Sequence, residues 1–193
     1  MKRVIIVHGW NGSKFAPMLH WLHTQLTSRG YEVHAPEIPG SEYPKIDIWV
    51  KTIAHVVGNL DRNTLFIGHS LGCQAILRTL QTFAFDENAG GMVFIAPWIK
   101  LKPGVVENEG AKSVAIARPW LKTPIDFTGI KRHTGPVVAL FSDNDPYVGL
   151  DQEKFFKKEL DAETIILPER GHFTIDDGVL KIPEALNAIL EME

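Results

Sequence analysis

The chain has 193 residues, a length that predicts one domain of ordinary size. Hydrophobic residues make up 45% and charged residues 22%, which excludes a disordered chain, and a single cysteine excludes a disulfide framework or a cysteine-based zinc site. Lysine and arginine total 20 against 23 acidic residues, so no broad basic surface points to a nucleic-acid partner.

The N-terminal apolar run covers only residues 4–7, which is too short for the apolar part of a signal peptide. No stretch approaches the roughly 18 apolar residues of a membrane span. We therefore expect a cytoplasmic protein without a membrane partner.

Along the chain, apolar runs alternate with helical patterns. The runs predict strands at residues 4–7, 31–35, 64–67, 92–96, 137–141 and 164–167. A first helix is expected because Phe15, Met18, Leu19, Leu22 and Leu26 share one helix face, with Ser13 as its N-cap and Gly30 at its end. Further helices are expected at 46–57, 71–80, around 155–160, and at 185–190 with Pro183 in the first turn.

This alternation predicts an α/β fold with a parallel sheet and helices on both faces. Residues 97–133, which contain four prolines, interrupt this alternation of strands and helices. Because a connection this long in a compact domain is usually functional, we expect a small cap or lid there, with one helix near 110–117. We call residues 97–133 the cap segment and expect the rest of 1–193 to form a single domain around it.

The sharpest motif is G-x-S-x-G at residues 68–72, between a predicted strand and a predicted helix. Such a turn lifts the Ser70 hydroxyl above the carboxyl edge of the sheet, and glycines on either side avoid a clash. The alternative is a glycine-bounded turn with an inert serine. The context favours a nucleophile.

A serine nucleophile needs a histidine base, which a carboxylate must orient. Asp143 and Asp145 follow the fifth predicted strand, and His172 follows the sixth. Both loops lie at the carboxyl edge, beside Ser70. We favour Asp145 as the orienting acid, with Asp143 as the alternative.

An oxyanion hole needs two N–H donors. The N–H of Leu71 is one, because it follows the nucleophile. Residues 8–12, after the first strand, should supply the other, from Trp10 or alternatively from Asn11. This glycine-containing loop could also belong to a nucleotide-binding fold, but it lacks the G-x-G-x-x-G spacing.

Together the motifs at 4–10, 68–72, 142–148 and 171–173 resemble those of α/β-hydrolases, and within them the small retinoblastoma-binding-protein-type serine hydrolases. The resemblance spans essentially the whole chain. It implies a three-layer fold with a six-stranded, mostly parallel sheet in the order 2-1-3-4-5-6, and a triad of Ser70, Asp145 and His172.

Other residues have simpler interpretations. His20 and His23 have metal-compatible spacing but no further ligands nearby, so no metal is expected. Cys73 is interpreted as a buried thiol and His8 as a structural hydrogen-bonding residue. Candidate pocket residues are Asn11, His69, Trp98 and Trp120, although the two tryptophans could equally be packing anchors.

We therefore predict a cofactor-independent serine hydrolase of carboxylesterase type, acting on a small-molecule acyl substrate. Thioesters, amides or lactones would suit the same residues. The alternative is a catalytically weak hydrolase-fold protein that binds a partner, and a phosphate- or dinucleotide-binding protein is disfavoured by the glycine spacing.

Overall fold

The structure is a computed structural model that describes residues 1–84 and 86–192. Its strands form one all-parallel six-stranded sheet in the order β2-β1-β3-β4-β5-β6. This confirms the predicted fold class and strand order. The strands are β1 (Arg3–Val7), β2 (Glu32–His34), β3 (Thr64–His69), β4 (Gly91–Ile95), β5 (Val137–Ser142) and β6 (Glu163–Leu167).

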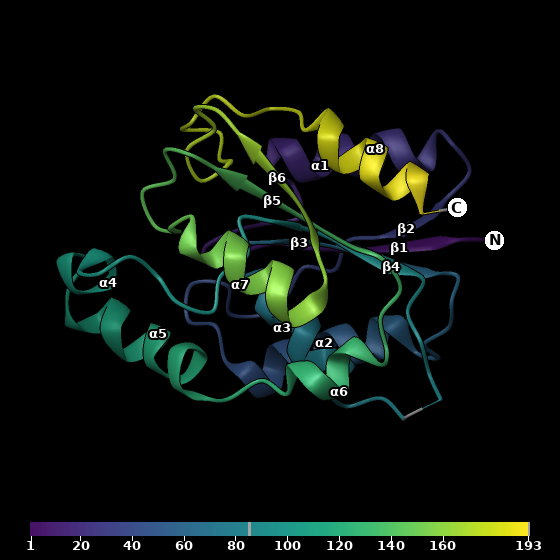
Figure 1. Cartoon of the computed structure of the whole chain (residues 1–193), viewed down its shortest axis with the longest axis horizontal. Helices are drawn as coiled ribbons and strands as arrows, with labels where there is room; N and C mark the ends of the chain where they lie inside the picture. The colour runs from purple at the N-terminus through teal and green to yellow at the C-terminus, as the bar shows by residue number, and fades with distance from the viewer. Residues whose placement is uncertain (85, 193) are drawn as a thin grey trace.

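Helices cover both faces of this sheet, giving three layers (Figure 1). One face carries α1 (Pro17–Thr27) and α8 (Pro183–Glu191). The other carries α2 (Ile46–Val57), α3 (Leu71–Leu80) and α7 (Asp151–Leu160). Each crossover therefore returns the chain to the same edge of the sheet, so every strand ends on one side of the molecule.

Alternate side chains of each central strand enter the two cores. In β1, Ile5 and Val7 pack with α2 and α3, whereas Val4 and Ile6 pack with α1 and α8. All four side chains are buried. Burial on both faces explains why the central strands read as continuous apolar runs.

The predicted start of the first helix is wrong. The Oγ of Ser13 does not cap α1; it accepts a hydrogen bond from the N–H of Phe15 at 3.1 Å, in a turn before the helix. Phe15 is 69% exposed and does not share the buried face. The helix begins at Pro17, whose fixed φ and missing N–H suit a first helical position.

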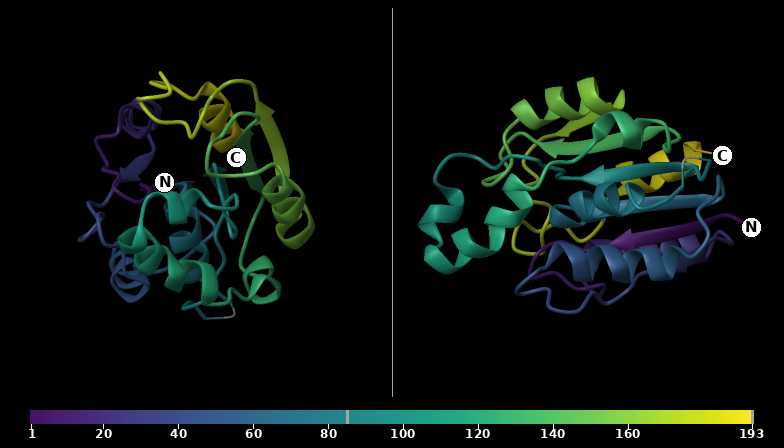
Figure 2. Two further views of the ribbon diagram at one scale, coloured as in Figure 1. Left: turned by 90° about the vertical axis from the view of Figure 1, so that its left-hand side faces the viewer. Right: turned by 90° about the horizontal axis from the view of Figure 1, so that it is seen from below.

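The cap segment contains three helices where one was predicted: α4 (Val105–Asn108), α5 (Ala111–Lys122) and α6 (Phe127–Lys131). Gly110, with a φ of 101°, separates α4 from α5, and Pro119 lies inside α5. The short lengths of α4 and α6 explain why no periodic pattern marked them. Helices α4 and α5 project beyond the carboxyl ends of the strands (Figure 2).

The start of β1 and the end of α8 lie close together on the opposite side, at the amino ends of the strands (Figure 2). The Nζ of Lys2 donates a hydrogen bond to the carbonyl oxygen of Met192 at 2.9 Å. Within the described part of the chain, no helix has both the length and the apolar character needed to cross a membrane.

Candidate active site

Ser70 occupies a strained turn between β3 and α3, with a φ of 52° that non-glycine residues rarely adopt. The turn is tightly packed on both sides. A Cβ on Gly68 would lie 2.9 Å from the backbone of Cys73, and one on Gly72 would lie 2.4 Å from the carbonyl oxygen of Val7. Only glycine fits at either position, which gives the physical reason for the spacing of the motif.

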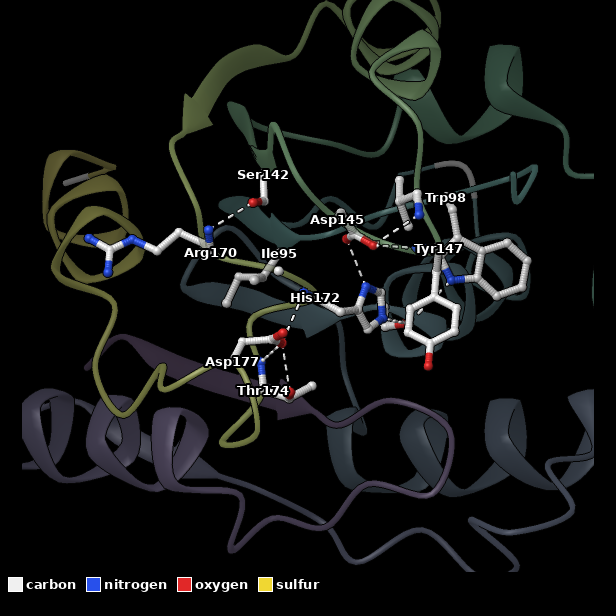
Figure 3. Close-up of polar contacts among 12 residues, drawn as sticks. Ile95, Trp98, Ser142, Asp145, Tyr147, Arg170, His172, Thr174 and Asp177 are labelled. Carbon is white, nitrogen blue, oxygen red and sulfur yellow. Dashed lines mark hydrogen bonds and ion pairs between the residues drawn. The ribbon is translucent and has the colours of Figure 1, made fainter. Parts of the chain in front are cut away.

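The structure brings Ser70, His172 and Asp145 into one hydrogen-bonded chain (Figure 3). The Nε2 of His172 lies 2.8 Å from the Oγ of Ser70. Its Nδ1 lies 2.8 Å from Oδ2 of Asp145. These residues follow the carboxyl ends of β3, β6 and β5, which open on the same edge of the parallel sheet. β5 and β6 are neighbours, and only β4 lies between β3 and β5.

The carboxylate of Asp145 is 1% exposed and fully engaged. Its Oδ1 accepts hydrogen bonds from the N–H groups of Tyr147 (2.8 Å) and Val148 (3.0 Å), which leaves Oδ2 for the imidazole. Two backbone donors fix the plane of the carboxylate and hence the orientation of the His172 ring.

Asp143, the alternative acid, has a different role. Its Oδ1 accepts a hydrogen bond from the N–H of Glu169 at 2.8 Å. Nearby, Oδ1 of Asn144 accepts one from the N–H of Gly171 at 2.7 Å. Both side chains thus fasten the loop after β6 to the end of β5, and it is Asp145 that reaches His172.

Asp177, which sequence reasoning missed, holds the backbone of His172. Its Oδ2 accepts hydrogen bonds from the N–H of His172 (2.9 Å), the N–H of Thr174 (2.9 Å) and the hydroxyl of Thr174 (2.6 Å) (Figure 3). Partial burial opposes ionisation, but these hydrogen bonds outweigh it and lower the pKa of the Asp177 carboxyl. Nothing in the local sequence distinguishes it from any aspartate in a turn.

His69 packs against the ring of His172, with ring centroids 5.2 Å apart. Its Nε2–H donates to the carbonyl oxygen of His172 at 2.9 Å. Burial, together with the nearby His172, lowers the pKa of His69 to about 4, so its imidazole is neutral at pH 7. A neutral neighbour does not repel the imidazolium that forms when His172 takes a proton.

The loop after β1 lies against the serine, since a Cβ on Gly9 would stand 3.1 Å from Cβ of Ser70. Of the two predicted donors, Asn11 uses its N–H on the carbonyl oxygen of Ser41 at 2.9 Å. Within the described chain, no acceptor takes the N–H of Trp10 or of Leu71. The unoccupied N–H of Trp10 favours Trp10 over Asn11 as the second predicted donor.

His8 lies beneath this loop, 1% exposed. Its Nδ1–H donates to the carbonyl oxygen of Gly9 at 2.9 Å, and its Nε2 accepts from the N–H of Ile38 at 3.3 Å. Burial lowers the pKa of His8, which favours this neutral form. Both ring nitrogens are occupied, so His8 supports the loop as a structural residue.

A cavity of about 600 Å³ opens over Ser70. Of the predicted pocket residues, Asn11, His69 and Trp98 line it. The cap segment contributes much of the remaining wall, together with Tyr147 and the loop after β6. The cap residues involved are Leu101, Val105, Val106, Glu109 and Ser113.

Trp120 does not line this cavity, so its prediction as a pocket residue is wrong. It is 1% exposed, and its indole N–H donates to the carbonyl oxygen of Pro44 at 3.0 Å. Its ring packs edge-on against Trp49, with centroids 5.7 Å apart. Trp120 is therefore a packing anchor, the alternative that the sequence analysis left open for it.

His20, His23 and Cys73 are the remaining candidates for metal or thiol chemistry. Among the described residues, no three His, Cys, Asp or Glu side chains gather closely enough to hold a metal ion. His20 and His23 stack with centroids 6.5 Å apart on α1. Cys73 is buried, and burial raises the pKa of its thiol, which keeps it protonated.

Comparison with known proteins gives one consistent family. A family model described as serine hydrolase matches residues 4–191. The YdeN protein of Bacillus subtilis (strain 168) is 25% identical over 182 residues, covering 94% of this chain and 91% of YdeN. Serine hydrolase RBBP9 of Rattus norvegicus is 24% identical over 170 residues, covering 88% of this chain and 80% of RBBP9.

Solved structures agree on the fold. The crystal structure of the B. subtilis ydeN gene product superposes with a TM-score of 0.89 at 23% identity, covering 100% of this chain and 98% of that one. A structure from work on carboxylesterases of Nitrososphaera gargenis gives a TM-score of 0.74 at 14% identity, covering 98% and 88%. At these identities the likeness establishes a common fold.

Proposed function

Because the chain belongs to the serine hydrolase family, as its motifs indicated, we propose that it hydrolyses carboxylic esters of small molecules through an acyl-enzyme on Ser70. The observation that carries this proposal is the unbroken hydrogen-bonded chain from Asp145 through His172 to the Oγ of Ser70. A buried carboxylate, an imidazole and a hydroxyl in this order form the arrangement that activates a serine.

In the first half of the reaction, His172 Nε2 takes the proton of Ser70 as the Oγ attacks the ester carbon. The N–H groups of Leu71 and Trp10 receive the developing oxyanion. His172 then gives its proton to the departing alcohol, and the acyl group stays on the Oγ. Asp145 keeps the Nδ1–H of His172 in place and stabilises the imidazolium.

In the second half, His172 Nε2 removes a proton from water, whose oxygen adds to the acyl carbon. The bond between that carbon and the Oγ then breaks, and the Oγ takes the proton back from His172. The carboxylic acid is released. Apart from the ester and water, every group that this cycle uses is a side chain or backbone N–H of the chain itself.

Substrate size and selectivity follow, in this proposal, from the cap segment. Its apolar side chains line one wall of the cavity over Ser70, and Lys102 donates a hydrogen bond to the backbone carbonyl of Asp145. A cavity of about 600 Å³ suits a small acyl group with its leaving group. The cap segment thus acts as a fixed wall on a single-domain scaffold.

A fluorophosphonate probe tests the chemistry directly. We expect one equivalent of label on the wild-type protein and none on Ser70→Ala, with Ser28→Ala on the far end of α1 labelling normally. A panel of p-nitrophenyl esters of increasing chain length should then show turnover that Ser70→Ala abolishes. Folded wild-type protein that neither labels nor turns over any ester would be a binding protein, and the proposal would be wrong.

A further inference from the structure

Trp98 contacts the nucleophile itself. Its indole Nε1–H donates a hydrogen bond to the Oγ of Ser70 at 3.3 Å, and the side chain is 2% exposed (Figure 3). The triad and the oxyanion donors account for the attack on the carbonyl without it. A second polar group on the reacting oxygen therefore needs a function of its own.

The backbone segment that carries Trp98 is fastened on both sides, and the indole itself is buried. On one side, the carbonyl oxygen of Ile95, just before the Trp98 loop, accepts a hydrogen bond from the N–H of Ser70 at 2.8 Å. On the other side, Oε1 of the buried Gln152 accepts hydrogen bonds from Ile99 (2.9 Å) and Lys100 (3.1 Å). The donor is thus preorganised, which is what gives a hydrogen bond catalytic value.

The two half-reactions use this donor differently. Before acylation, the Oγ is a hydroxyl, a good acceptor, so the indole stabilises the ground state as well as the transition state. In the acyl-enzyme, the Oγ is an ester oxygen, a poor acceptor. When the bond between the acyl carbon and the Oγ breaks, the electron pair moves to the Oγ, which becomes a strong acceptor. The hydrogen bond therefore strengthens mainly as the serine leaves.

We propose that Trp98 is a further catalytic residue, whose indole N–H stabilises the Oγ of Ser70 as the leaving group when water hydrolyses the acyl-enzyme. The step balances without another reagent. Water supplies the oxygen of the acid and one proton, which passes through His172 Nε2 to the Oγ. The inference rests on the proposed function, because it concerns the second half of the same reaction.

Two replacements at position 98 remove the donor. Trp98→Phe removes the N–H and part of the ring. Incorporation of 3-benzothienylalanine replaces the N–H by sulfur and keeps the shape of the side chain, so it separates hydrogen bonding from packing and guards against a folding defect in Trp98→Phe. Trp21→Phe, on α1 and outside the cavity, controls for the loss of a tryptophan.

The readout is the rate of each half-reaction with p-nitrophenyl acetate, followed by rapid quenching and intact-protein mass spectrometry. Both replacements should slow loss of the acetyl group about tenfold or more while changing its formation by less than about threefold, so that acetyl-enzyme accumulates. Trp21→Phe should behave as wild type.

Two results would overturn the inference in distinguishable ways. In the first, wild-type protein is acetylated, and the benzothienyl replacement slows acetylation and deacetylation equally or changes neither rate. Trp98 then has no special role in deacylation, and the proposed function stands. If wild-type protein never acetylates on Ser70 and ignores the fluorophosphonate probe, the proposed function fails and the role of Trp98 fails with it.

Discussion

The N–H of Ser70 donates a hydrogen bond to the carbonyl oxygen of Ile95 at 2.8 Å, which ties the turn after β3 to the last residue of β4. The ladder of the sheet thereby continues one residue beyond β3, into a turn whose φ of 52° would otherwise be costly. The position of the serine is set by the sheet and by α3 together.

The acid assignment predicts a sharp difference between two neighbouring aspartates. Asp145→Asn should lower kcat about 10³–10⁴-fold, because an amide no longer holds the Nδ1–H of His172 in the productive tautomer. Asp143→Asn, which alters only a hydrogen bond to the N–H of Glu169, should stay within about tenfold of wild type. Esterase assays measure kcat for both folded variants. A larger loss of kcat in Asp143→Asn than in Asp145→Asn would show that Asp143 is the orienting acid.

Gly72 should be intolerant of a side chain for steric reasons. A Cβ there would lie 2.4 Å from the carbonyl oxygen of Val7 and 2.6 Å from that of His8. Gly72→Ala should therefore lower the free energy of unfolding by about 3 kcal/mol or more, as in severe overpacking. Urea denaturation measures this.

Gly30→Ala is the matched control for Gly72→Ala. Gly30 has a φ of 85° but open space around the added Cβ, so only the backbone conformation is penalised, by about 1–2 kcal/mol. If both variants lost the same free energy of unfolding, close packing around Gly72 would contribute nothing to stability.

The lowered pKa of His69 predicts that the stability of the fold depends on pH. Burial and His172 lower its folded-state pKa to about 4, whereas an unfolded histidine titrates near 6.5. Between these values the unfolded chain binds the extra proton, so stability is complete above about pH 6.5 and falls as the pH drops toward 4, by at most about 3 kcal/mol. Denaturation at several pH values measures the slope.

His69→Gln, which keeps a side-chain donor for the carbonyl of His172, should flatten that slope. His55→Gln, on the exposed side of α2, should leave it unchanged. An unaltered slope in His69→Gln would place the acid sensitivity elsewhere, with the buried His8 as the next group to replace.

Arg78 fastens the cap segment to α3. Its guanidinium donates hydrogen bonds to the carbonyl oxygens of Trp120 (3.1 Å), Thr123 (2.8 Å) and Pro124 (3.3 Å), at the end of α5. Arg78→Met would leave these carbonyls unpaired and should lower the free energy of unfolding by about 2–4 kcal/mol.

The same change should expose the connection between α5 and α6 to thermolysin before the sheet unfolds. Arg118→Met, on the exposed surface of α5, is the matched control and should resist the protease as wild type does. Identical cleavage patterns for the two variants would show that Arg78 does not hold the cap segment.

Local patterns in the sequence were enough to predict the sheet and the residues around the serine. The buried strands are continuous apolar runs. The glycines at 68 and 72 mark positions where the tight turn around Ser70 leaves no room for a Cβ. The topology of a parallel sheet then brings Asp145 and His172 to Ser70, although more than 70 residues separate Asp145 from the serine.

What the sequence did not reveal depends on contacts between distant loops. The bonds of Asp177 to His172 and of Trp98 to Ser70 join residues whose immediate neighbours carry no distinguishing signal. Ser13 was a plausible cap, but Pro17 set the start of α1 instead. In the cap segment, α4 and α6 have only four and five residues, which is too few to show a helical period.

The hydrogen bond between Lys2 and Met192 has a practical consequence for handling the protein. Because the start of β1 and the end of α8 lie at the amino edge of the strands, we expect tags or fusion partners attached there to stay clear of the cavity over Ser70 (Figure 2). A short linker could also join the two ends of the chain. New ends could then be opened in an exposed loop at the same edge. Such a circular permutant, attached to a surface through this edge, would present its cap segment unobstructed.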